Sequence, residues 1–127
     1  MSKPSRVTGE KIWLDGEFVP FADAKVHVLT HTLHYGLGVF EGIRCYRTAD
    51  GRSAVFRLAE HVRRLLDSAH INLMQLPFSQ QTLEAAILET LRANHLLEGY
   101  IRPIAFIGDG VMGLNPADNP IRVAIIA

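Results

Sequence analysis

The segment His34-Tyr-Gly-Leu-Gly-Val-Phe-Glu-Gly-Ile-Arg-Cys-Tyr46 combines aromatics, glycines and one arginine in an alternation typical of a β-strand. If residues 39–46 are extended, one face carries Phe40, Gly42, Arg44 and Tyr46, and the other carries Val39, Glu41, Ile43 and Cys45. A glycine inside a strand indicates either a β-bulge or the close approach of a ligand or another chain. The spacing leaves both alternatives open, and we interpret the segment as one wall of a pocket.

The composition indicates one globular domain. The chain has 127 residues, of which 48% are hydrophobic, enough to bury a core. Its 13 lysines and arginines balance its 13 aspartates and glutamates, so no strong field attracts nucleic acid or an anionic bilayer. No apolar run could span a membrane, and the single cysteine, Cys45, excludes an internal disulfide. We therefore expect no nucleic-acid or membrane partner, and a cytoplasmic location.

The two ends of the sequence differ in character. Residues 1–10 are polar and contain Pro4 and Gly9, which predicts a flexible tail before a domain over residues 11–127. Residues 121–127 form an apolar, strand-like run that continues to the last position. Because domains normally end in exposed polar segments, this run predicts that the chain is a fragment of a longer protein.

Two Asp-Gly pairs predict β-hairpins. Asp15-Gly16 separates Lys11–Leu14 from residues 17–19, and this dipeptide supplies the positive φ angles of a two-residue type I′ turn. Asp50-Gly51 predicts a second hairpin, which joins the opening segment to residues 52–56.

The periodicity beyond residue 56 predicts two helices and two strands. A buried stripe over residues 57–69 leaves Arg63 and Arg64 outside it, and a second helix begins after the candidate N-cap Ser79. Residues 100–107 and 121–127 are predicted strands, joined by a Gly- and Pro-rich loop. Because strands and helices are segregated, we expect an α+β fold, a two-layer sandwich with a mainly antiparallel sheet and helices on one face.

Three candidate ligand motifs are better explained without ligands. Gly108-Asp-Gly-Val-Met-Gly113 matches a dinucleotide pattern, but the prolines that follow exclude the helix such a site needs. His27, His31 and His34 lack a matched fourth ligand, so we interpret them as hydrogen-bonding residues rather than a metal site. Cys45 has no activating neighbour and is interpreted as a small buried hydrophobe.

Two arginines are candidate binding residues, each with an ordinary alternative. Strand alternation puts Tyr100 beside Arg102, and a guanidinium with a phenol can hold a carboxylate. The alternative is an exposed strand arginine paired with an acidic neighbour. Arg64 follows Glu60 by four residues and precedes Asp67 by three, which is equally typical of a surface ion-pair ladder.

Six short segments occur in the order found in one enzyme family. They are residues 25–28, 34–36, 39–46, 60–61, 64–65 and 100–103. Through them the chain resembles the N-terminal small domain of the branched-chain amino acid aminotransferases, pyridoxal-phosphate enzymes of fold type IV. The resemblance covers nearly the whole chain from Ile12. It implies a pyridoxal 5′-phosphate cofactor and a large catalytic domain that is missing here.

The resemblance also implies roles for particular residues. The position of Arg64 contacts the cofactor phosphate in that family. Substrate-binding positions correspond to Tyr35, Phe40, Gly42, Arg44, Tyr100, Arg102, Met112 and Leu114. Among them, Tyr35 and Phe40 line the pocket for the branched side chain, and Tyr100 and Arg102 help hold substrate carboxylates. Met112 and Leu114 would close the pocket of a partner subunit. The implied substrates are branched-chain amino acids with glutamate or 2-oxoglutarate, and the implied assembly is a homodimer or higher homo-oligomer.

The departures from the family limit this interpretation. None of Lys3, Lys11 and Lys25 occupies the Schiff-base position, so we expect that lysine beyond residue 127 and no catalytic residue in this chain, which would be inactive alone. D-amino acid aminotransferases, which resemble the chain less, have a histidine where this sequence has Ile104. Aminodeoxychorismate lyases are a further alternative with the same fold. If the chain truly ends at Ala127, a non-catalytic binding or assembly module is the remaining alternative.

Overall fold

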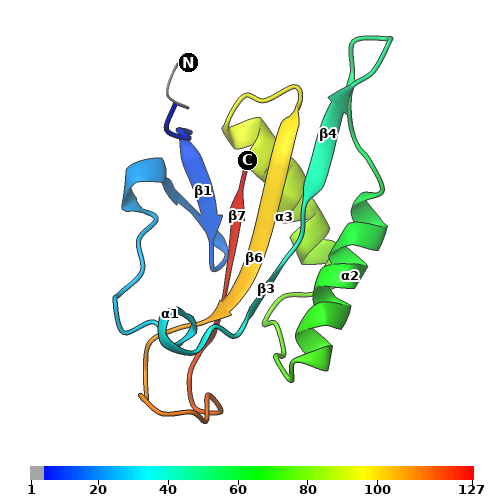
Figure 1. Cartoon of the computed structure of the whole chain (residues 1–127). Helices are drawn as coiled ribbons and strands as arrows, with labels where there is room; N and C mark the ends of the chain where they lie inside the picture. The colour runs from blue at the N-terminus through cyan, green and yellow to red at the C-terminus, as the bar shows by residue number, and fades with distance from the viewer. Residues whose placement is uncertain (1–4) are drawn as a thin grey trace.

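The computed structural model describes residues 5–127 and places one antiparallel sheet against two long helices (Figure 1). The sheet order is β2-β1-β7-β6-β4-β5, and β3 pairs with β6. The strands are β1 Lys11–Leu14, β2 Glu17–Pro20, β3 Gly38–Phe40, β4 Ile43–Arg47, β5 Ser53–Val55, β6 Gly99–Ile107 and β7 Ile121–Ile126. The helices are η1 Phe21–Asp23, α1 His31–Tyr35, α2 Leu58–Ile71 and α3 Gln80–Ala93. The predicted α+β sandwich, with α2 and α3 on one face, is confirmed (Figure 1).

The first hairpin turns as predicted and also receives the last strand. Asp15 and Gly16 have φ angles of 51° and 99°, the signs of a type I′ turn. The Asp15 carboxylate accepts hydrogen bonds from the Val123 amide at 2.9 Å and from Arg122 Nε at 2.8 Å. These bonds fix β7 beside β1, so the hairpin turn links the two ends of the described chain.

The second hairpin and both long helices lie close to their predicted positions. β4 pairs with β5 across the turn that contains Asp50 and Gly51. The hydroxyl of Ser79 accepts the Thr82 amide at 3.1 Å and so caps α3. Helices and strands enclose a core whose most deeply buried members include Ile43, Val62, Leu65, Ile87, Ile101, Val123 and Ile125.

The segment 39–46 is two strands rather than one, which corrects the single extended strand predicted above. Both strands keep one continuous register against β6, with Val39 opposite Ala105 and Ile43 opposite Ile101. The ladder is interrupted where Glu41 donates its amide to the Pro103 carbonyl at 3.0 Å, because proline has no N–H to return. No extra residue is inserted into the ladder, so the β-bulge considered from the sequence is absent. The predicted alternation of buried and exposed side chains over residues 39–46 is confirmed.

His34 and Tyr35 also differ from the prediction. They end the short helix α1 instead of opening the extended segment, and Gly36 closes that helix with a φ of 79°. The loop over residues 108–120 contains no helix, in agreement with the rejection of a dinucleotide site. Its base is held by the buried Asn119, whose amide group bonds Gly108 and Val111.

The predicted N-terminal tail lies partly outside the described residues, which begin at residue 5. Residues 5–9 have no regular secondary structure and are exposed. Glu10 already belongs to the fold, because its amide bonds the Asn94 side chain and its carbonyl accepts the Phe21 amide. Within residues 5–127, no helix has the length and apolar character that a membrane crossing requires.

We expect Pro103→Ala to repair the gap in the ladder between β3 and β4. The new amide at position 103 would face the Glu41 carbonyl, since the pair already shares the reverse bond. It should therefore exchange with solvent at least about a hundredfold more slowly than an unstructured amide. Hydrogen exchange followed by NMR measures this, with the amide of Ala105 as a protected control in both proteins. A rapidly exchanging amide at position 103 would contradict this account of the interruption.

Candidate functional site

The sheet face turned away from α2 and α3 carries an aromatic and cationic cluster, which we call the open-face cluster: Phe40, Tyr100 and Arg102. The guanidinium carbon of Arg102 lies 4.2 Å from the centre of the Phe40 ring. Arg102 Nη2 donates to the Tyr100 hydroxyl at 2.6 Å. Phe40 is 58% exposed and Tyr100 44% exposed, so the cluster presents an apolar surface next to a guanidinium. Such a surface can accept an apolar side chain or a carboxylate.

Gly42 makes room for this cluster. A Cβ at this position would lie 2.7 Å from the Tyr100 hydroxyl and 3.3 Å from its ring. The close approach that a strand glycine indicates is therefore made by Tyr100 of β6, and the prediction of a ligand or second chain touching Gly42 itself is not needed. Arg44 lies opposite Tyr100 in the register, exposed on the same face.

The opposite side of the same segment carries a buried carboxylate. Glu41 is only 4% exposed, and it accepts Arg64 Nε at 2.5 Å and Arg64 Nη2 at 2.9 Å. His61 Nδ1 lies 2.9 Å from the second carboxylate oxygen. We assign the imidazole proton to Nδ1, because an ionised carboxylate can only accept. We call these three residues the Glu41 cluster.

The Glu41 cluster identifies the acidic residue that pairs with Arg64. Its partner is Glu41, rather than Glu60 or Asp67 on its own helix. The hydrogen bond from the Arg64 guanidinium has the largest effect on the pKa of Glu41 and lowers it. Burial raises this pKa and the His61 hydrogen bond lowers it further, so the net result is a lowered pKa. The carboxylate in turn raises the pKa of Arg64. The pair is thus a fixed ion pair, although the Arg64 side chain itself remains 67% exposed.

A cavity of about 260 Å³ lies against the exposed side of this pair. Arg57, Glu60, His61 and Arg64 line it. Glu60 is bonded to Arg57 at 3.3 Å, so its charge is partly matched within the cavity wall. Arg64 can donate five N–H bonds and gives two of them to Glu41. The remaining donors and the cationic wall suit an anionic ligand.

The open-face cluster and the Glu41 cluster flank one edge of the sheet. Phe40 and Glu41 are consecutive, and strand alternation sends their side chains to opposite faces. Within the described residues, β3 pairs with β6 alone, so its outer edge is free. A ligand that lies along this edge could reach both clusters.

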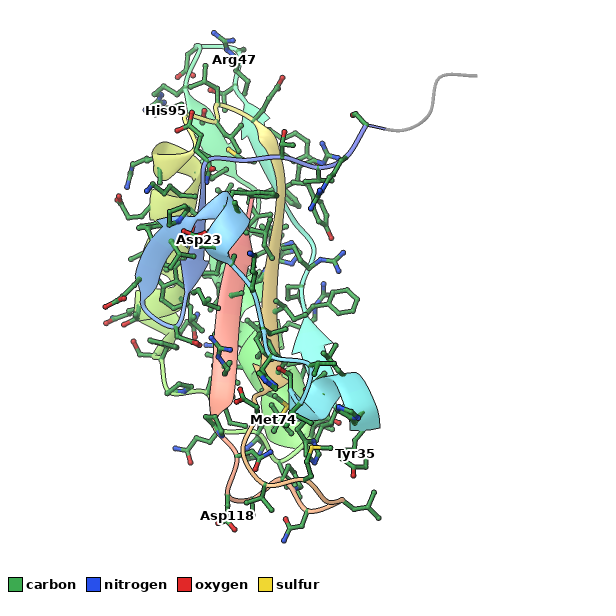
Figure 2. All side chains as sticks on the ribbon, turned by 90° about the vertical axis from the view of Figure 1, so that its left-hand side faces the viewer. Asp23, Tyr35, Arg47, Met74, His95 and Asp118 are labelled. Carbon is green, nitrogen blue, oxygen red and sulfur yellow. The ribbon has the colours of Figure 1, made fainter. Side chains whose placement is uncertain are left out.

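Tyr35, Met112 and Leu114 are gathered at the end of the molecule where α1 meets the loop over residues 108–120. Figure 2 shows Tyr35 and Asp118 at this same end. His31 Nε2 bonds the Gly113 carbonyl at 2.7 Å, and its ring lies 4.4 Å from the Tyr35 ring. The three residues are exposed, Leu114 by 84%. The predicted substrate-binding residues of the described chain therefore form two groups, one on the open sheet face and one at this loop end.

His27, His31 and His34 each make a hydrogen bond with a backbone group, in agreement with their interpretation from the sequence as hydrogen-bonding residues. His31 bonds Gly113, His34 Nε2 bonds the Val28 carbonyl at 2.8 Å, and His27 Nδ1 accepts the Leu29 amide at 3.0 Å. Among residues 5–127, no three ligand-type side chains are grouped in a way that could hold a metal ion. Cys45 is buried, as predicted.

Sequence reasoning missed the roles of Glu41 and His61 as partners of each other, and it did not identify Gly113 as the partner of His31. A signal existed for Glu41, because it falls on the apolar face of an alternating segment, where a charged residue needs a partner. The identity of that partner depends on how α2 crosses the sheet. The contact between His31 and Gly113 joins residues distant in sequence, and no local pattern predicts it.

Comparisons with known proteins agree with one another. The family model for amino-transferase class IV matches residues 38–127. The branched-chain-amino-acid aminotransferase of Pseudomonas aeruginosa is 51% identical over 116 residues, which are 91% of this chain and 38% of that protein. The chain thus spans less than two fifths of the length of this curated relative.

Two solved structures of branched-chain amino acid aminotransferases are similar in fold. The enzyme from Escherichia coli superposes with a TM-score of 0.89 at 46% identity, over 93% of this chain and 39% of its own. The T.th. enzyme, complexed with N-(5′-phosphopyridoxyl)-L-glutamate, gives a TM-score of 0.90 at 46% identity, over 94% of this chain and 40% of its own. The T.th. enzyme has also been solved with 4-methylvaleric acid.

We expect Glu41→Gln to lower the free energy of unfolding at pH 7 by about 1–3 kcal/mol, because it breaks charge-assisted bonds around a buried group. Folding lowers the pKa of Glu41 from its ordinary value of 4.5, so the ionised carboxylate stabilises the fold above that value. This contribution is lost as the pH falls through the lowered pKa. Urea unfolding at a series of pH values should show the variant and wild type converging below pH 4.5.

The matched control is Glu89→Gln, which removes a carboxylate from the exposed ion pair with Arg92 in α3. Exposed pairs contribute little, so its effect should stay below about 1 kcal/mol at every pH. A destabilisation by Glu41→Gln that does not shrink on acidification would contradict the assignment.

Proposed function

This chain belongs to the class IV aminotransferase family, and from that membership we propose that it forms the small domain of a pyridoxal-phosphate-dependent branched-chain amino acid transaminase. The full-length protein would transfer the amino group of leucine, isoleucine or valine to 2-oxoglutarate. The observation that carries the proposal is the open-face cluster, in which a guanidinium lies across an exposed aromatic ring. One surface of this kind suits both an aliphatic side chain and a dicarboxylate.

The Glu41 cluster supports a site for the cofactor phosphate. Arg64 stands at a cavity with a cationic wall and keeps N–H donors free of Glu41. A phosphate monoester matches a guanidinium in geometry and charge. Pyridoxal phosphate supplies the electron sink for reaction at the substrate Cα when it is bound. The residues of this chain contribute anchoring and orientation, and we assign the Schiff-base lysine to the remainder of the full-length protein.

The substrate would lie on the open-face cluster. Arg102 would bind the side-chain carboxylate of glutamate or 2-oxoglutarate, held in place by its bond to Tyr100. Phe40 would pack against the side chain of leucine, isoleucine or valine. Gly42 would keep the Tyr100 ring close to the strand, and Arg44 would add positive charge on the same face.

The loop end supports a site shared between subunits. Tyr35, Met112 and Leu114 form an exposed, largely apolar group apart from the open-face cluster. In our proposal this group completes the pocket of a second copy, so the active protein is at least a homodimer. We also propose that it acts in the cytoplasm. A symmetric homodimer would let each copy supply this group to the pocket of the other.

The full-length protein should catalyse amino-group exchange between leucine and 2-oxoglutarate in the presence of pyridoxal phosphate. Arg102→Met keeps an unbranched stem beside Phe40 and removes the guanidinium, so the KM for 2-oxoglutarate should rise about tenfold or more, with a smaller change for leucine. Steady-state kinetics measures both. Arg47→Met, at the far end of the molecule from Tyr35 (Figure 2), is the control. Absence of exchange in the wild type contradicts the proposed function, and equal changes for both substrates contradict the role of Arg102.

Arg64→Ala should weaken the binding of pyridoxal phosphate about tenfold to a hundredfold, the loss expected for charge-assisted bonds to a phosphate. Absorbance titration of the cofactor measures the dissociation constant, and circular dichroism reports folding. Arg63→Ala removes the neighbouring exposed arginine and should leave the affinity close to wild type. Equal affinity in the Arg64→Ala variant and the wild type would remove the phosphate role.

A further inference from the structure

Glu41 is the one acidic side chain that is buried within residues 5–127, and the proposed function gives it no task. A buried carboxylate is costly unless ionic and hydrogen-bonded partners compensate it. Three N–H donors from α2 surround it, two from Arg64 and one from His61. Its own amide is held by the Pro103 carbonyl, so backbone and side chain are both fixed.

This arrangement restricts a side chain that would otherwise be mobile. Arg64 is largely exposed, and a free arginine on a helix surface samples many rotamers. The bidentate bond fixes the plane of the guanidinium as well as its position. The N–H groups that Glu41 does not occupy are thereby held in one direction beside the cavity.

His61 completes the anchor from the second side. Its Nδ1 donates to the carboxylate oxygen that also accepts Arg64 Nη2. The carboxylate therefore cannot rotate without losing a bond to one of the two partners. Both donors lie on α2, three residues apart, so the helix surface itself sets the spacing of the anchor.

We propose that Glu41 is a positioning residue for the phosphate group of the cofactor, acting through Arg64; this inference rests on the proposed function. The charge of Glu41 alone would oppose an anion, since a carboxylate near the cavity repels phosphate. Its contribution is geometric: it holds Arg64 ready to bind, so that the ordering cost is met by folding rather than by binding. The two effects predict opposite signs when the charge is removed.

The test compares Glu41→Gln with Glu60→Gln in the full-length protein. Both variants remove one negative charge from the surroundings of the cavity and keep the side-chain length, but only Glu41 bonds Arg64. Glu41→Gln should weaken binding of pyridoxal phosphate about tenfold, the loss of roughly one charge-assisted hydrogen bond. Glu60→Gln should tighten binding, because Glu60 lines the cavity and its charge repels phosphate without holding Arg64. Absorbance titration gives the dissociation constants.

Further measurements test whether Glu41 acts on the phosphate group and whether it acts through Arg64. Pyridoxal, which lacks the phosphate, should bind wild type and Glu41→Gln with the same affinity. In an Arg64→Ala background, adding Glu41→Gln should cause no further loss of pyridoxal phosphate affinity, because the residue acts only through Arg64. Inorganic phosphate should compete with pyridoxal phosphate less effectively in Glu41→Gln than in wild type.

If Glu41→Gln fails to fold by circular dichroism, Glu41→Asp replaces it. Its side chain is one methylene shorter, which misplaces the carboxylate while keeping its charge.

The outcomes separate two kinds of failure. If Glu41→Gln and Glu60→Gln both tighten binding, or if pyridoxal is affected as much as pyridoxal phosphate, Glu41 is not a positioning residue. If the Glu41→Gln loss persists in full without Arg64, the route through Arg64 is wrong. If wild type binds no pyridoxal phosphate and exchanges no amino groups, the proposed function itself fails.

Discussion

The pairing of residues 38–45 with β6 in one continuous register is the constraint on which both halves of the candidate site depend. It places Phe40 and Glu41 on opposite faces and sets Tyr100 over Gly42. A slip of one residue would turn Glu41 toward solvent and Phe40 into the helix layer. The aromatic contact on one side and the buried carboxylate on the other both resist such a slip, so the site and the register stabilise each other.

Local chemistry explains why much of the fold was predictable. Asp15-Gly16 and Ser79 act within a few residues of their own positions, and the turn and the cap occur where the sequence indicates them. The break between β3 and β4 was missed, because it arises from Pro103, a residue of another strand. Helical His34 and Tyr35 were missed since the glycines around them fit a strand motif as well as a helix cap.

In the candidate site, too, the local features could be predicted from the sequence and those that depend on distant residues could not. Alternation along one strand put Tyr100 beside Arg102, and the two do bond. Alternation in residues 39–46 also put Glu41 on an apolar face, a conflict between pattern and composition from which a buried partner could have been inferred but was not. The choice among Glu41, Glu60 and Asp67 as the partner of Arg64 depends on how α2 crosses the sheet, and sequence spacing carries no such information.

The pairing of β1 with β7 has a consequence for how the protein forms during synthesis. Trp13 of β1 pairs with Ile125 of β7, so about 110 further residues must be synthesised before the β1 edge of the first hairpin is covered. At a translation rate of about 5–20 residues per second, that edge stays open for several seconds or more. An uncovered strand edge is a template for pairing with other nascent chains, and both the shortness of β1 and its Lys11 are features that discourage such pairing.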